Sequence, residues 1–209
     1  TNLSNINLQS HFYMKTILCA LVLTLNVVTS FAQVKSDSSK HLTFKGVPID
    51  GTLNEYVSKM KKSGFALMRT EEGVALLKGD FAAYKNCILG VSTLKQKNLV
   101  SKITVIFPEQ DTWSSLSSNY FNLKEMLTEK YGEPSECVEK FQSSTLDDDG
   151  YKMTQVQLDA CKYYTTYNTE KGTIELSIAH DGVTRCFVKL TYLDKINGVT
   201  IKKEALSDL

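Results

Sequence analysis

TIELSIAHDGVTRCFVKLTYL, residues 173–193, contains two β-strand patterns separated by a turn. Apolar side chains alternate with others at Ile174, Leu176 and Ile178, which is the period of a strand that buries one face. The turn residues at 181–184 come next, and a second alternating strand runs from Arg185 to Leu193. This pattern predicts an antiparallel hairpin, and therefore a sheet whose strands are neighbours in sequence.

The hairpin closes a longer series that begins with a helix. Apolar residues recur every three or four positions after a cap at Asp111 or Thr112, and Gly132 and Pro134 end the helix. That apolar stripe consists of Trp113, Leu116, Tyr120, Leu123, Leu127 and Tyr131. Strands are predicted at Cys137–Gln142 and Cys161–Asn168, ahead of the hairpin. The segment Met153–Leu158 fits a helix or a strand equally well.

An earlier part of the chain has the same order of elements. Thr52 and Glu55 form a T-x-x-E capping box at the start of a helix that Gly64 ends. Four strands are predicted after it, at Phe65–Arg69, Val74–Phe81, Tyr84–Leu94 and Leu99–Phe107. We therefore predict an α+β fold made of a tandem repeat, in which one helix precedes a meandering antiparallel sheet of about four strands. The halves would span residues 41–108 and 109–209.

The segment Met14–Gln33 has the pattern of a secretory signal peptide. Lys15 provides the positive charge, an uncharged apolar run follows, and Ser30-Phe31-Ala32 is a small-x-small cleavage site. We expect a signal peptide at 14–32, an upstream leader foreign to the native chain at 1–13, and a flexible tether at 33–40. A membrane anchor is the weaker interpretation, because polar residues interrupt the apolar run. The prediction is a periplasmic or extracellular protein with no membrane span after cleavage.

The charge balance argues against nucleic-acid binding. The chain has 24 Lys and Arg residues against 23 Asp and Glu, and Lys15 is the charged residue that cleavage would remove. The remaining chain is therefore neutral, whereas nucleic-acid binders need a basic field.

Four cysteines follow the signal peptide: Cys87, Cys137, Cys161 and Cys186. An even number in an exported chain suggests disulfides, and composition alone leaves every pairing open. If the strands around Cys137 and Cys161 form a hairpin centred near residues 148–149, these two cysteines lie opposite each other. We therefore predict a Cys137–Cys161 disulfide.

Patterns for catalysis and metal binding are missing from the sequence. His180 lies on the same strand face as Ile174, so a structural histidine is favoured over a base paired with Cys161 or Cys186. His41 is the other histidine after the signal peptide. The acidic run 147–149 before Gly150 does not have the ligand spacing of a calcium loop. We expect no catalytic, cofactor-binding or metal-binding residues.

A tyrosine-rich strand is the best candidate for binding. Alternation places Tyr163 and Tyr167 on one face of the predicted strand, with Tyr192 nearby if the last three strands form a meander. Exposed tyrosines offer a large contact area at a small cost in side-chain entropy. Ordinary β-propensity is the alternative explanation. We predict a binding site for a protein or peptide at Tyr163, Tyr167 and Tyr192.

The residues 47–52 (VPIDGT), 131–134 (YGEP) and 170–174 (EKGTI) resemble a group of small exported proteins of Gram-negative anaerobes that have no assigned function. The duplicated order of elements also resembles, at the level of fold, the tandem architecture of secreted beta-lactamase inhibitor proteins. We therefore expect a protein- or peptide-binding module of the cell envelope. A hydrolytic enzyme with an unrecognised site and a structural envelope component are the alternatives.

Overall fold

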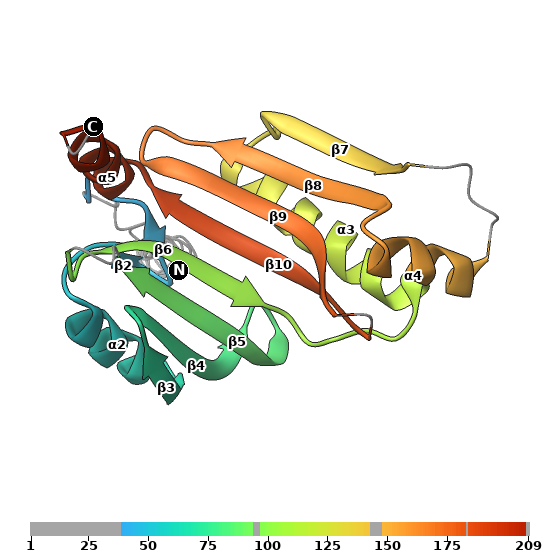
Figure 1. Cartoon of the computed structure of the whole chain (residues 1–209), viewed down its shortest axis with the longest axis horizontal. Helices are drawn as coiled ribbons and strands as arrows, with labels where there is room; N and C mark the ends of the chain where they lie inside the picture. The colour runs from blue at the N-terminus through green and yellow to red at the C-terminus, as the bar shows by residue number, and fades with distance from the viewer. Residues whose placement is uncertain (1–38, 94–96, 143–147, 183, 208–209) are drawn as a thin grey trace, which may run out of the picture. The chain divides into compact units, whose positions relative to one another are not determined.

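The computed structural model describes residues 39–93, 97–142, 148–182 and 184–207 (Figure 1). These residues belong to one compact unit. The expected leader and signal peptide lie outside the described residues, as does the tether up to residue 38.

A large antiparallel sheet organises this unit. Its eight strands have the spatial order β3-β4-β5-β6-β10-β9-β8-β7. A hairpin of β1 (Thr43–Phe44) and β2 (Val47–Pro48) forms a separate two-stranded sheet. The strands of the large sheet are β3 (Ala66–Glu71), β4 (Val74–Phe81), β5 (Tyr84–Thr93), β6 (Val100–Ile106), β7 (Glu136–Phe141), β8 (Cys161–Asn168), β9 (Gly172–Asp181) and β10 (Arg185–Asp194).

The two predicted helices begin at their expected caps. In α2 (Leu53–Lys62), the Thr52 side chain accepts from the backbone N–H of Glu55 and the Glu55 carboxylate accepts from the backbone N–H of Thr52, which confirms the capping box. In α3 (Trp113–Tyr131), the side chain of Thr112 caps the first turn. Gly132 ends α3 with a φ of 82°, a conformation that favours glycine.

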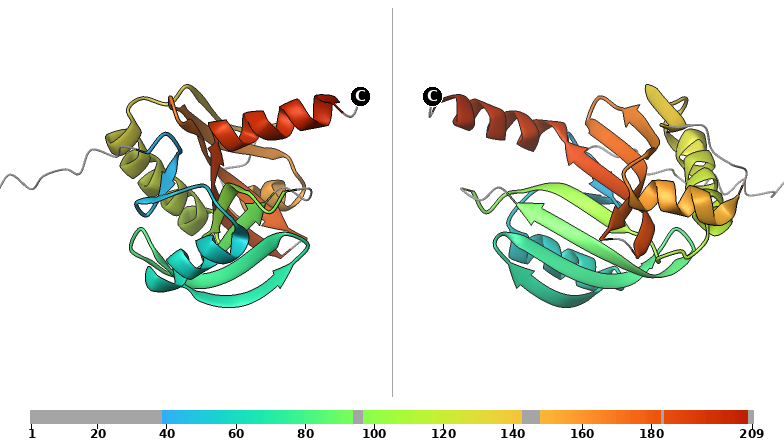
Figure 2. Two further views of the ribbon diagram at one scale, coloured as in Figure 1. Left: turned by 90° about the vertical axis from the view of Figure 1, so that its left-hand side faces the viewer. Right: turned by 45° about the vertical axis from the view of Figure 1, so that its right-hand side comes forward.

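Two further helices complete the fold. The undecided segment is helical, as part of α4 (Asp149–Gln157), and Asp148 caps it by accepting from the backbone N–H of Tyr151. The last helix, α5 (Lys195–Ser207), follows β10 directly and was not predicted. Figure 2 shows α5 pointing away from the sheet.

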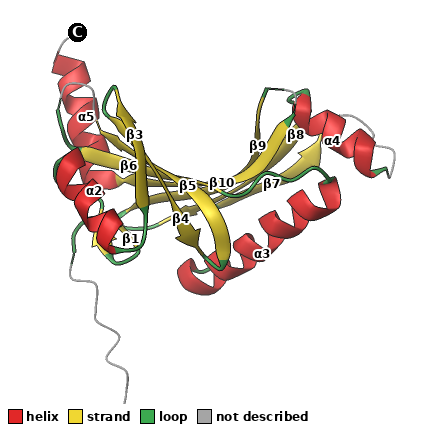
Figure 3. Cartoon of the chain, turned by 90° about the horizontal axis from the view of Figure 1, so that it is seen from below, coloured by secondary structure: helices red, strands yellow, loops and turns green. Residues whose placement is uncertain are grey.

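One face of the sheet supplies the core. Leu89 of β5, Val105 of β6 and Leu190 of β10 are fully or almost fully buried, and the register places them opposite one another. Since paired residues share a face, the same face is buried across the middle of the sheet. Figure 3 shows α2 and α3 on one side of the sheet, where their apolar stripes cover this face.

The α+β class and the antiparallel sheet are confirmed, and the two predicted halves share a single sheet. The order of elements is α2 followed by β3–β6, then α3 followed by β7–β10 with α4 between β7 and β8. The last strands of the two series, β6 and β10, pair with each other, with Val105 opposite Leu190. One hydrophobic cluster runs under both series.

The predicted disulfide is not formed: among the described residues, Cys87, Cys137, Cys161 and Cys186 are all free thiols. The expected register is wrong because β7 pairs with β8 so that Cys137 faces Thr165, while Cys161 faces Phe141. The connection between the two strands contains α4 rather than a tight turn. The two cysteines therefore lie four positions apart along the ladder, which is beyond the reach of a disulfide.

Candidate functional site

The face of the sheet opposite α2 and α3 is the candidate functional surface, and we call it the open face. Thr104 of β6 and Thr191 of β10 are paired at its centre, and both are half-buried. On the β4–β6 side, the open face carries Leu76, Ile88 and Ile106. On the β7–β10 side it carries Lys140, Lys162, Ser177 and Lys189, together with the apolar side chains of Val138 and Leu193.

Lysines give the β7–β10 side a basic character. Lys189 of β10, Lys162 of β8 and Lys140 of β7 project from the open face, as the strand register shows. Within the described residues, their ammonium groups have no ion-pair or hydrogen-bond partner. Lys140 and Lys162 lie directly opposite each other, and like charges in that position are destabilising.

A depression of about 540 Å³ opens between β8 and β9, and we call it the slot. It forms because the β8–β9 ladder ends at Tyr164 and Ser177, although both strands continue beyond these residues. The lining residues are Val138, Lys140, Cys161, Lys162, Tyr163, Tyr164, Glu175, Ser177, Ile178 and Lys189.

Besides the lysines, the slot is lined by a tyrosine hydroxyl, a carboxylate and a thiol. The Tyr164 hydroxyl donates to Glu136 across a distance of 2.6 Å, and this hydrogen bond raises the pKa of Tyr164. Glu175 is the one carboxylate that lines the slot. Burial raises the pKa of the Cys161 thiol to about 12, so this thiol stays protonated and is a poor nucleophile.

Ser177 is the most unusual residue of the slot. Its side chain is only 8% exposed, and its hydroxyl has no hydrogen-bond partner in the described structure. A buried hydroxyl without a partner costs free energy, and most buried polar groups in native proteins are paired. A ligand in the slot would supply the missing partner.

The tyrosines that the sequence suggested for binding lie on the covered face. Tyr167 is 1% exposed and Tyr192 is 4% exposed, so both belong to the core. Tyr163 is half-buried, and its ring packs edge-on against Trp113 at a centroid distance of 5.0 Å. The expected exposed tyrosine surface is therefore wrong for Tyr167 and Tyr192, and only Tyr163 touches the slot.

His180 is held by two acceptors. Its Nδ1 lies 2.7 Å from the Gly182 carbonyl oxygen, and its Nε2 lies 3.0 Å from Oδ1 of Asp159. The Gly182 carbonyl and the Asp159 carboxylate raise the pKa of His180. With both ring nitrogens engaged, His180 is not positioned to act as a free base.

Cys137 belongs to a small polar cluster beneath α3. Its sulfur lies 3.2 Å from Nζ of Lys124 and 3.3 Å from Oε1 of Glu139, and Lys124 also bonds to Glu139. The cluster links α3 to β7. It lies on the opposite side of the sheet from the slot.

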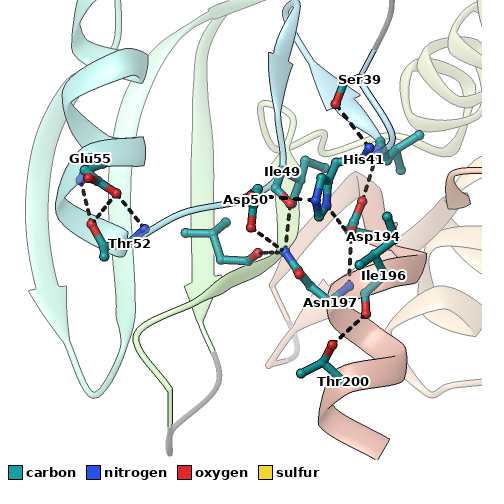
Figure 4. Close-up of polar contacts among 12 residues, drawn as sticks. Ser39, His41, Ile49, Asp50, Thr52, Glu55, Asp194, Ile196, Asn197 and Thr200 are labelled. Atoms are coloured by element: carbon teal, nitrogen blue, oxygen red, sulfur yellow. Dashed lines mark hydrogen bonds and ion pairs between the residues drawn. The ribbon is translucent and has the colours of Figure 1, made fainter.

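A second polar cluster surrounds the buried carboxylate of Asp194 (Figure 4). Asp194 accepts from the backbone N–H groups of Leu42 and Asn197, and its Oδ2 lies 3.0 Å from Nδ1 of His41. The other ring nitrogen of His41 is 3.6 Å from Asp50. Both nitrogens therefore face carboxylates, and the cluster fastens residues 41–50 to the start of α5.

The described residues contain no group of three or more His, Cys, Asp or Glu side chains that would hold a metal ion. Asp148 and Asp149 of the acidic run act as helix caps, since Asp149 accepts from the backbone N–H groups of Trp113 and Ser114. Asp147 lies outside the described residues. In the same part of the chain, no helix is both long enough and apolar enough to span a membrane.

Comparisons with family models, with characterised proteins and with solved structures find no match for this chain. The geometry of the open face and the slot therefore provides the functional argument.

Proposed function

We propose that this chain is an exported binding protein of the cell envelope, periplasmic or extracellular, that engages a protein or peptide through the open face of its sheet. The observation that carries the proposal is the unpaired Ser177 hydroxyl, buried in a slot beside lysines that have no ion-pair partner among the described residues. Export is supported by the signal-peptide pattern of residues 14–32.

Binding is favoured over catalysis by the chemistry of the slot. A nucleophile needs an adjacent base or a lowered pKa, whereas the Cys161 thiol has a raised pKa. Among the slot residues, the lysines and hydroxyls are suited to hydrogen bonding and charge pairing.

We also infer that the segment from α2 to β6 and the segment from α3 to β10 are two copies of one helix-plus-four-strand unit. The support is the mirrored strand order about the β6–β10 pair, and the helix that precedes each series. We also propose, on the residues quoted above, that the chain is related to the small exported proteins of Gram-negative anaerobes that it resembles.

Site-specific photo-crosslinking in cells that naturally produce the protein tests the binding face. A photoreactive amino acid at Thr104 or Thr191 should give discrete adducts, because both positions lie at the centre of the open face. The matched control position is Glu125, which is exposed on α3. Adducts from Glu125 alone, or no adducts from the open face, would contradict the proposal.

N-terminal sequencing of the secreted product tests export. Cleavage after Ala32 is expected, and a mature product that still carries Met14 would contradict the location.

A further inference from the structure

We propose that the slot between β8 and β9 binds an acidic peptide segment, with its carboxylates on Lys140, Lys162 and Lys189 and with a hydrogen bond to the Ser177 hydroxyl. This inference rests on the proposed function and specifies the chemistry of the partner. Four features of the described residues carry it: the charges, the unpaired hydroxyl, the strand separation and the shape of the depression.

Charge complementarity selects an anionic ligand. Lys140 and Lys162 face each other across the β7–β8 ladder, and Lys189 projects from β10 on the other side of the slot. Such a pair of opposed lysines destabilises the free sheet, and an acidic ligand between the lysines relieves the repulsion. Glu175 is the only acidic residue of the lining, so the slot stays basic.

The buried hydroxyl selects a ligand that reaches into the slot. Ser177 pairs with Lys189 of β10 on one side and with Tyr164 of β8 on the other. Its hydroxyl therefore lies between Lys189 and the opposed lysines of β7 and β8. A carboxylate that spans this gap can accept a hydrogen bond from Ser177 while it faces Lys189. A charge-assisted hydrogen bond of this kind is stronger than a neutral one.

The separation of the strands selects a peptide over a small anion. Beyond Tyr164 and Ser177, β8 and β9 continue without pairing to each other. An extended peptide offers N–H and C=O groups to strands that lack a partner on one side, in addition to its side chains. The volume of about 540 Å³ accommodates a short segment of this kind.

Fluorescence anisotropy with labelled, acetylated hexaglutamate tests the proposal on the full mature chain. We expect saturable binding with one peptide per chain, and binding that weakens as salt is added, because solvent-accessible ion pairs are screened. Labelled hexaglutamine is the matched probe, and it should not bind. Equal binding of both peptides, or no saturation with hexaglutamate, would overturn the proposal.

The variants locate the binding to the slot. Lys140→Gln, Lys162→Gln and Lys189→Gln should each weaken hexaglutamate binding about two- to fivefold, which is the range of an exposed ion pair. Lys162→Arg should retain binding. The matched control is Lys102→Gln, on the open face of β6 but outside the slot, and it should change the affinity by less than about twofold. A larger loss from Lys102→Gln than from the slot variants would overturn the assignment.

Ser177→Ala separates binding from folding. This variant should weaken the affinity for hexaglutamate about three- to tenfold. The melting temperature should stay the same or rise, because an unpaired buried hydroxyl is removed. Unchanged affinity would show that Ser177 takes no part. Displacement of hexaglutamate by an equal concentration of inorganic phosphate would assign the slot to a small anion and overturn the peptide proposal.

These outcomes are separate from those of the crosslinking experiment. Adducts from Thr104 and Thr191 together with failure of the acidic peptide would retain the open face as a binding surface and remove the acidic ligand.

Discussion

The two parts of the sheet, β3–β6 covered by α2 and β7–β10 covered by α3, have the same order of elements but use polar groups differently. Under α2 the contacts are apolar, and the buried hydroxyl of Tyr56 has no partner in the described structure. Under α3 the Tyr120 hydroxyl bonds to Thr165, and the Tyr167 hydroxyl bonds to Thr128. The open face also differs between the two parts: over β4–β6 it carries Leu76, Ile88 and Ile106 beside Lys78 and Lys102, and over β7–β10 it carries the slot.

This difference indicates a division of roles within one sheet. Polar networks fix side chains in defined positions, and they demand that each member is satisfied. The part with the network beneath it also carries the basic slot. The apolar part contributes mainly to the shared core.

The largest effect should come from truncating the core in either part. Leu89→Ala in β5 and Leu176→Ala in β9 each remove a fully buried side chain, and each should lower the free energy of unfolding by about 2–5 kcal/mol. Because one cluster runs under both parts, each variant should shift a single transition. Urea unfolding, followed by the fluorescence of Trp113 and by far-UV circular dichroism, checks this.

The two signals separate the alternatives, because Trp113 lies in α3 and circular dichroism reports both parts. If Leu89→Ala leaves the Trp113 transition in place and shifts only part of the dichroism, the two parts unfold independently. Leu67→Ala, at a residue that is 43% exposed, is the control and should change little.

The second prediction concerns a substitution that removes a hydrogen bond of the polar network under α3. Tyr120→Phe should lower the free energy of unfolding by about 1–3 kcal/mol, since it leaves the fully buried Thr165 hydroxyl without its tyrosine partner. Chemical denaturation measures the loss. Adding Thr165→Val should restore part of the stability, because both polar partners are then absent. A double variant that loses the full sum of two separate penalties would contradict the coupling.

Several elements of the fold were predictable from local sequence. β4 and β8 have the predicted bounds, because alternation and flanking turn residues mark both strands. The segment Met153–Leu158, most of which lies in α4, was ambiguous, since its apolar positions fit both periods. The helix at Lys195–Ser207 lacked an apolar stripe and is fixed instead by the contacts of Asp194 and Asn197 with distant segments.

The candidate site was less predictable, because it depends on which face the helices cover. Alternation correctly groups Tyr163 with Tyr167, but it does not reveal that α3 covers that face. Lys140, Lys162 and Lys189 are far apart in the sequence and meet only through the strand register. The separation of β8 from β9 has no local signal at all.

The third prediction concerns the unpaired hydroxyl under α2. Tyr56→Phe should leave the free energy of unfolding unchanged or raise it by about 1 kcal/mol, because the variant removes a buried hydroxyl that has no partner in the described structure. The same denaturation measurement applies, with Tyr120→Phe as the matched opposite case. A loss as large as that of Tyr120→Phe would mean that the two parts do not differ in this way.

The smallest effect is a pH dependence confined to the second part, at His180. The Gly182 carbonyl and the Asp159 carboxylate raise the pKa of His180 in the folded state. A raised folded-state pKa means that the stabilisation is fully present below the unfolded value of about 6.5, and is lost as the pH rises through the folded value. Because the Asp159 side chain is 90% exposed, we expect the contacts of His180 to contribute at most about 1 kcal/mol to the free energy of unfolding.

The free energy of unfolding of the wild type should therefore exceed that of His180→Gln most at about pH 5.5, and the difference should shrink by about pH 8.5. A constant difference across this range would show that the contacts of His180 do not favour its protonated form.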